Sequence, residues 1–305
     1  RGKKDGPRLF VCAAIHGDEI IGVEIVRRLL RVKPLERLRG TLLVVPVVNS
    51  FGFLNRSRYL PDRRDLNRSF PGRPKGSLAA RLAHIFMTEV VERADFGIDL
   101  HSAAVNRINL PQIRVTPSRS ETMQHAEAFG APLTLTSRIR EGSLRHAAQA
   151  HGIDVIVYEA GEALRFDELS VRTGVAGILR VMRHMEMIAS KGVPKLRLKS
   201  IRSTSSYWLR APAGGLLRSF RTIGEEVATG DILGAISDPF GETDTEVIAE
   251  DPGLLVGRTN LPVVNEGDAV FHVALIKQTI DAESTIDALA THLEADPLFD
   301  EDEII

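Results

Sequence analysis

Strand-like apolar runs alternate with helical patterns through the first two-thirds of this 305-residue chain. The strand-like runs cover residues 9–15, 41–48, 96–100, 112–115 and 153–158. Between them, apolar residues recur at the spacing of an amphipathic helix, as at Ile20, Val23, Val26 and Leu30. Strands that alternate with helices favour a largely parallel sheet with helices on both faces. We therefore expect an α/β fold with a mixed, mostly parallel sheet covered by helices.

The composition changes after about residue 190. Residues 191–206 are predicted to be a connector, and residues 207–275 contain short β-branched runs interrupted by turn residues. This pattern predicts a smaller all-β domain that follows an α/β domain of residues 1–190. Residues 276–305 are predicted to form an acidic tail that holds one helix.

Charge and cysteine content exclude several classes of partner. The formal net charge is −1, so bulk electrostatics favour neither nucleic acid nor an anionic membrane as a partner. No apolar run approaches the roughly 18 residues of a membrane span. The single cysteine, Cys12, lies in the middle of the first predicted strand, so a disulfide framework is not expected. We expect a cytoplasmic protein without nucleic-acid or membrane partners, and the sequence is compatible with an oligomer.

Side chains that suit a metal ion follow two of the predicted strands. His16 and Glu19 come directly after the first strand, and His101 follows the third. The active site of such a sheet usually lies beyond the carboxyl ends of its strands, so these side chains should share one rim with Asn49 and Glu159. Two imidazoles and one carboxylate make a zinc site whose fourth position is open for water. That open position is typical of a catalytic zinc ion.

A lone His-x-x-Glu is more often a surface or capping pair than a metal site. A second strand end with complementary ligands reverses this balance, because Asp99 lies near the end of the third predicted strand and His101 directly follows it. Asp99 lies two residues before His101, shares its face of the strand, and is predicted to accept a hydrogen bond from its imidazole. The chain has no His-Glu-x-x-His motif, which excludes the common single-helix zinc protease site.

Glu159 directly follows the buried run 153–158 and is the candidate general base. Beside a zinc ion, such a carboxylate takes a proton from water and delivers it to a leaving nitrogen. The structural alternative is a charge at the N-terminus of a following helix. Glu162 is the competing base, and it lies farther from the end of the strand.

A loop with six arginines between Arg56 and Arg73 is the third candidate feature. The plain interpretation is a solvated loop in which several arginines pair with Asp62 and Asp65. A guanidinium is also the preferred partner of a substrate carboxylate, and near a zinc ion it can stabilise a developing oxyanion. We expect two of the six arginines to be functional.

Together, these stretches resemble the succinylglutamate desuccinylase/aspartoacylase family, a branch of the zinc carboxypeptidase-like fold. The matching stretches are His16-Gly-Asp-Glu19, Asp65-Leu-Asn67-Arg68, Asp99-Leu-His101-Ser102 and Tyr158-Glu159-Ala-Gly161. The resemblance covers roughly residues 8–190. Residues 207–275 look like the β-rich C-terminal domain of the family, with the pattern of a biotinyl/lipoyl-like barrel. Residues 249–253 of its central turn include no lysine, so attached biotin or lipoate is not expected.

The resemblance implies a ligand set and a base. His16, Glu19 and His101 would bind one zinc ion per chain, and Glu159 would activate a water molecule. Asn67 would help to hold the carboxylate of the substrate.

The resemblance also implies two arginine roles. Arg68 would hold the substrate carboxylate together with Asn67, and an arginine shortly before that pair would polarise the scissile carbonyl. Arg58, Arg63 and Arg64 compete for the second role, and Arg58 is favoured because Arg58-Tyr59 is similar to an Arg-Tyr step of the family. Some relatives also place a tyrosine from later in the chain in the site, a role that the sequence leaves unassigned.

We therefore predict a zinc-dependent hydrolase that removes an acyl group from the nitrogen of a small amino acid-like compound. A carboxypeptidase that acts on peptides is the first alternative, because the same ligands would serve it. A covered cleft would favour small substrates, and an open groove would favour peptides. The second alternative is a non-catalytic binding protein with a vestigial site.

Overall fold

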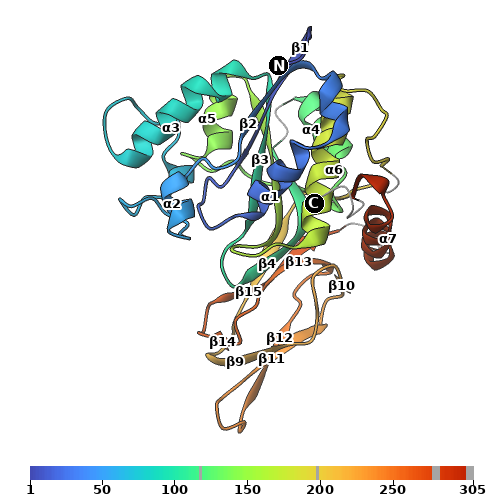
Figure 1. Ribbon diagram of the computed structural model, residues 1–305. Helices are drawn as coiled ribbons and strands as arrows, with labels where there is room; N and C mark the ends of the chain where they lie inside the picture. The colour runs from blue at the N-terminus through green and yellow to red at the C-terminus, as the bar shows by residue number, and fades with distance from the viewer. Residues whose placement is uncertain (117–118, 197–198, 277–281, 300–305) are drawn as a thin grey trace.

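The computed structural model describes residues 1–116, 119–196, 199–276 and 282–299. Helices cover both faces of a central sheet, and a β-rich region extends from one end of that sheet (Figure 1). The expected α/β fold with a smaller C-terminal β region is confirmed. Among the described residues, no helix is long and apolar enough to cross a membrane.

Four neighbouring parallel strands form one half of the central sheet, in the order β2-β1-β3-β6. Their bounds are Arg39–Val45 for β2, Lys4–Ala13 for β1, Phe96–Ala103 for β3 and Asp154–Glu162 for β6. The next strand, β4 (Arg107–Val115), runs antiparallel to β6, and β5 (Leu133–Thr136) is parallel to β4. The sheet is therefore mixed and mostly parallel in this half, as predicted.

The same sheet continues into the β-rich region. Strand β13 (Gly253–Thr259) pairs with β4, and β15 (Ala269–Leu275) and β8 (Ser206–Arg210) extend the sheet further. Two short strands join at its sides, β7 (Ile201–Ser203) on β5 and β10 (Glu226–Val227) on β13. The predicted connector thus contains a strand of the main sheet. The division into domains stays a prediction, since one sheet runs through both parts.

A second sheet of four strands, ordered β12-β11-β9-β14, completes the β-rich region in the described part of the chain. The bounds are Asp244–Ile248 for β12, Ile232–Ser237 for β11, Gly215–Ser219 for β9 and Val263–Val264 for β14. Its buried side chains pack with those of β13 and β15 in one core.

The strands of this sheet have apolar side chains on both faces, and a layer of helices covers each face. On one face lie α1 (Ile21–Leu29), α4 (Ser120–Phe129) and α6 (Glu168–His184), and on the other lie α2 (Ser50–Leu54), α3 (Leu78–Glu89) and α5 (Leu144–Ala150). Strand β1 shows the reason, since Leu9 and Val11 pack in one core while Phe10 and Cys12 pack in the other. Helix α7 (Ala282–Glu294) places Leu289 and Leu293 in the first of these cores.

Several predicted strand ends differ from the structure. Strands β3 and β6 continue to Ala103 and Glu162, so that His101 and Glu159 lie within strands and do not follow them. Each of these two strands is paired on both sides, which extends the ladder past the apolar run. Strand β5 had no counterpart among the predicted strands.

Candidate functional site

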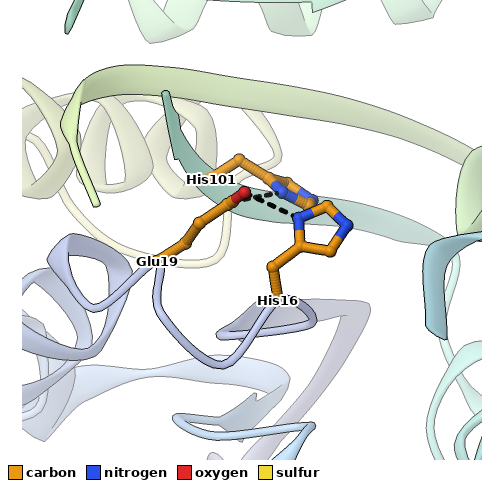
Figure 2. A group of neighbouring side chains, drawn as sticks. All are labelled: His16, Glu19 and His101. Carbon is orange, nitrogen blue, oxygen red and sulfur yellow. Dashed lines mark hydrogen bonds and ion pairs between the residues drawn. The ribbon is translucent and has the colours of Figure 1, made fainter. Parts of the chain in front are cut away.

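The candidate metal ligands come from two neighbouring parallel strands. Strand β1 ends at Ala13, and the loop that leads to α1 carries His16 and Glu19. His101 lies near the end of β3, whose Leu100 is the register partner of Ala13. The predicted ligands therefore meet at one edge of the sheet (Figure 2).

The three side chains converge on a common point. His16 Nδ1 lies 2.7 Å from Glu19 Oε1, and His101 Nδ1 lies 2.7 Å from Glu19 Oε2. All three residues are buried, and their ligand atoms lie within 4.8 Å of one another. Burial alone would raise the pKa of Glu19, but the two histidines outweigh it and lower that pKa below its usual range. A carboxylate that stays ionised between two imidazole nitrogens fits a divalent cation.

Each histidine contacts a second carboxylate through its other ring nitrogen, Nε2. His101 Nε2 lies 2.8 Å from Asp99 Oδ2, as predicted, and His16 Nε2 lies 3.2 Å from Asp65 Oδ1. Burial lowers the pKa of both histidines, but the surrounding carboxylates outweigh it and raise both values above 6.5. These contacts leave the Nδ1 atoms on the side where a metal ion could bind. From the sequence, Asp65 is expected to pair with arginines of its loop and to open the Asp65-Leu-Asn67-Arg68 stretch, and its contact with His16 comes from the structure alone.

Glu159 on β6 is the register partner of His101 on β3. Its Oε2 accepts a hydrogen bond from Asn109 Nδ2 at 3.0 Å, and its Oε1 lies 3.3 Å from Arg114 Nη1. The competing base, Glu162, accepts a hydrogen bond from the backbone of Asn106 instead, and it does not line the cavity that contains the metal ligands. Asn109 and Arg114 carried no signal in the sequence, because their role depends on the pairing of β4 with β6.

The arginine loop contributes Arg58, Asn67 and Arg68 to the same cavity. Arg58 Nη1 lies 3.2 Å from Glu19 Oε1, and Arg58 Nη2 lies 3.1 Å from Asp65 Oδ2. Burial lowers the pKa of Arg58, but the two carboxylates outweigh this effect, so the pKa is raised above its usual value. Of the competing arginines, neither Arg63 nor Arg64 lines this cavity in the described structure.

Residues Asn67 and Arg68 lie on a short 3-10 helix, η2 (Leu66–Arg68), that Asp65 caps through the backbone N–H of Asn67. The side-chain oxygen of Asn67 accepts a hydrogen bond from the backbone of Leu144 at 2.9 Å. This contact fixes the helix against the start of α5.

Asn49 lies at the predicted rim, where its backbone N–H donates to the carbonyl oxygen of Ala14 after β1, but its side chain points elsewhere. Asn49 is fully buried, and its side-chain oxygen caps α2 by accepting a hydrogen bond from the backbone of Gly52 at 2.8 Å. It does not line the cavity.

The β-rich region closes one side of the cavity, which measures about 660 Å³. Trp208 and His272 form its wall, with stacked rings whose centroids are 4.6 Å apart. None of the three tyrosines, all of which are described, lines the cavity. No motif in the sequence points to Trp208 or His272 as residues of the site. A buried His-Glu-His cluster that could hold a metal ion, a carboxylate and cationic donors on one cavity are together suited to hydrolysis of a polar carbonyl compound.

Comparisons with known proteins agree with this arrangement. A model of the Succinylglutamate desuccinylase/Aspartoacylase catalytic domain matches residues 5–185. The chain is 25% identical over 290 residues to N-alpha-acetyl-L-2,4-diaminobutyric acid deacetylase of Halomonas elongata, which covers 90% of this chain and 84% of the relative.

Two solved structures have a similar fold. A succinylglutamate desuccinylase/aspartoacylase from Rhodobacter sphaeroides is 28% identical with a TM-score of 0.78, covering 88% of this chain and 86% of that one. The product-bound ectoine utilization protein EutE (DoeB) from Ruegeria pomeroyi is 25% identical with a TM-score of 0.80, covering 90% and 87%.

Proposed function

Because the chain belongs to the succinylglutamate desuccinylase/aspartoacylase family, we propose that it is a zinc-dependent deacylase that hydrolyses the amide bond of a small N-acyl amino acid. The deacetylase name of the Halomonas elongata relative supports this reaction type. The observation that carries the proposal is the register of β3 and β6, which puts Glu159 beside His101 on one cavity.

His16, Glu19 and His101 would hold one zinc ion. Their two nitrogens and one carboxylate match the ligand types of catalytic zinc sites, and Asp65 and Asp99 would keep the two imidazoles oriented. When bound, zinc polarises an amide carbonyl and makes a water molecule more acidic.

The protein's own side chains would carry the remaining steps. Glu159 takes the proton of the attacking water and delivers it to the departing amine. Arg58 stabilises the negative charge that develops on the carbonyl oxygen. Asn67 and Arg68 bind the carboxylate of the substrate, for which a guanidinium is the preferred partner.

The cavity has a wall from the β-rich region, which favours a small substrate over a peptide. Trp208 and His272 from the β-rich region form one wall of it, and an open groove would have favoured the carboxypeptidase alternative. The presence of all three metal ligands and the base argues against a vestigial binding site.

Replacing Glu159 by glutamine tests the proposal. We expect Glu159→Gln to lower turnover of N-acetyl amino acids by about 10²–10⁴-fold while its zinc content stays that of the wild type. Glu162→Gln is the matched control, since Glu162 does not line the cavity. Near-normal turnover by zinc-loaded Glu159→Gln would contradict the proposed base.

A further inference from the structure

Residues with a left-handed backbone gather around the candidate site. In the described part of the chain, the residues other than glycine with a positive φ are Ala14, Arg56, Arg63, Asn106, Leu164 and Glu186. All of them except Glu186 lie within about five residues of a residue that lines the cavity. Strain of this kind persists only where the surroundings enforce it, and it is common at functional sites. Leu164 is unusual among them because a bulky apolar residue rarely adopts this conformation.

Packing of the Leu164 side chain does not account for its backbone conformation. Its φ is +59°, and its side chain is 37% exposed. Among the described residues, it belongs to none of the apolar cores. A half-exposed side chain gains little burial to offset the strain of its backbone. The reason for the strain therefore lies in what the backbone itself contacts.

The backbone N–H of Leu164 donates to the carbonyl oxygen of Asp18 at 2.9 Å. This carbonyl belongs to the peptide group that directly precedes the Cα atom of Glu19. The N–H of the same peptide group, that of Glu19, donates to the carbonyl oxygen of His16 at 3.1 Å. Because a peptide group is planar, these two hydrogen bonds fix its orientation. They thereby fix the direction in which the Glu19 side chain leaves the backbone.

Neighbouring contacts hold Leu164 on both sides. The backbone N–H of Ala163 donates to the carbonyl oxygen of Ala103 at the end of β3, at 3.0 Å. On the other side, Asp167 caps α6 by accepting a hydrogen bond from the backbone of Ser170 at 2.7 Å. Few residues join these two fixed points, so the chain has to turn sharply at Leu164. With an ordinary φ at this position the turn would open, and the N–H would move away from Asp18.

The start of the same loop has a similar contact. Ala14 is also left-handed, with a φ of 51°, and its carbonyl oxygen accepts a hydrogen bond from the backbone of Asn49 at 2.9 Å. The loop that carries His16 and Glu19 is therefore held at both ends by N–H groups of segments that follow other strands. Supporting contacts of this kind place ligand side chains before a metal ion binds.

We propose that Leu164 is a positioning residue for the candidate metal site. Its strained backbone donates the hydrogen bond that fixes the peptide group before Glu19, so that the cluster of His16, Glu19 and His101 is arranged in the metal-free protein. This inference rests on the proposed zinc-dependent function and adds to it a residue that contacts neither substrate nor metal. The side chain at position 164 matters only through the backbone conformation that it permits.

Substitutions at Leu164 separate the backbone from the side chain. Leu164→Gly and Leu164→Asn accept a positive φ, so both should keep the hydrogen bond to Asp18 and a zinc affinity near that of the wild type. Leu164→Val keeps an apolar side chain, but a β-branched residue resists this conformation. We expect Leu164→Val to bind zinc about tenfold or more weakly than the wild type, which is the effect of losing an orienting partner of a metal ligand.

Glu186 provides the matched control. Its backbone conformation is almost the same, with a φ of 58°, but it follows α6 and does not line the cavity in the described structure. Glu186→Val should lower the urea midpoint of unfolding, as Leu164→Val does, because both put a β-branched residue where φ is positive. It should keep the zinc affinity of the wild type, which a general loss of stability would not explain.

Two measurements decide the inference. Hydrogen exchange of the metal-free protein, followed by mass spectrometry on peptides that cover residues 14–20, reports on the loop without zinc. Leu164→Val should exchange faster in these peptides than the wild type, whereas Leu164→Gly, Leu164→Asn and Glu186→Val should match the wild type. Competition against a chelator of known affinity then measures zinc binding by the same proteins.

Wild-type exchange or wild-type zinc affinity in Leu164→Val overturns the inference. An equal loss of zinc affinity in Leu164→Asn overturns it as well, because the side chain would then matter and not the backbone. An equal loss in Glu186→Val would do the same, since strain would then act through general stability. Failure of the proposed function looks different: a wild-type protein that binds no zinc, or hydrolyses no N-acyl amino acid, contradicts the zinc-dependent deacylase. The exchange of the metal-free proteins then still decides the role of Leu164.

Discussion

Asn109 on β4 donates its side-chain amide to Glu159 Oε2 on β6 at 3.0 Å. Arg114, five residues further along β4, contacts the other oxygen of the same carboxylate. In a regular strand, residues five apart face opposite sides. The register between β4 and β6 shifts between Asn109 and Gln112, and Pro111, which has no N–H to donate, lies at this irregularity. The bulge therefore brings both side chains to the proposed base.

Loss of the Asn109 contact should impair catalysis more than binding. We expect Asn109→Ala to lower kcat by about tenfold with a smaller change in KM, because a hydrogen bond to a charged group is lost. Steady-state kinetics at matched zinc content measures the effect. Gly257→Ala should reproduce part of it, since a Cβ there would lie 2.8 Å from the side-chain oxygen of Asn109. Wild-type kcat in both variants would contradict this positioning role.

Asp65 and Asp99, which contact the Nε2 atoms of the two histidines, should strengthen metal binding. Asp65→Ala and Asp99→Ala are each expected to weaken zinc binding by about 10–100-fold, because each leaves one imidazole without its orienting partner. Competition against a chelator of known affinity measures the change. Asp62→Ala is the control, since Asp62 contacts Arg64 and not a histidine. An unchanged affinity in both variants would show that the imidazoles need no such support.

Gly17 should be required for the conformation of the loop between β1 and α1, which carries His16 and Glu19. A Cβ on Gly17 would lie 2.0 Å from the backbone carbonyl carbon of Gly52, so the loop that carries His16 and Glu19 would have to move. We expect Gly17→Ala to lose most of its zinc affinity, measured by metal content after dialysis. Gly214→Ala should be tolerated, because its Cβ would meet no atom closer than 3.7 Å.

Acid should destabilise the protein partly through His125. Burial, followed by the charge of nearby His184, lowers the pKa of His125 to about 4. The unfolded chain then binds a proton that the folded protein does not, so stability is lost as the pH falls from about 6.5 towards 4. Urea unfolding should show that His125→Leu reduces the loss between pH 7 and pH 5 by about 1 kcal/mol, since solvent screens part of the effect at this partly exposed ring. An unchanged pH dependence would show that His125 is already charged in the folded state.

The fold class and the pair His16 and Glu19 could be predicted from the sequence because their causes are local, whereas the approach of His101 depends on the strand order. Apolar runs identify buried strands, and the loop after β1 is too short to carry His16 and Glu19 far from the sheet edge. His101 joins them because β3 is the parallel neighbour of β1. Asp99 followed from the two-residue period of a strand.

The surroundings of the triad could not be predicted in the same way. Glu159 was identified, but its partners lie on β4, which runs antiparallel to β6 and contains a bulge. The sequence predicts Asn49 on the same rim as Glu159, yet its side chain caps α2. A pattern of apolar residues contains no information on which of two polar side chains turns inwards.

The sequence by itself determined the α/β class and the positions of His16, Glu19 and His101 at or near strand ends, because strand periodicity and a short loop act over a few positions. Only the tertiary structure decided the wall of the cavity. Pairing of β13 with β4 joins residues about 150 positions apart in the chain, as Gly257 and Asn109 show, and it carries His272 and Trp208 to the site. Such pairing depends on the burial and hydrogen bonding of the whole sheet, so no single segment encodes it.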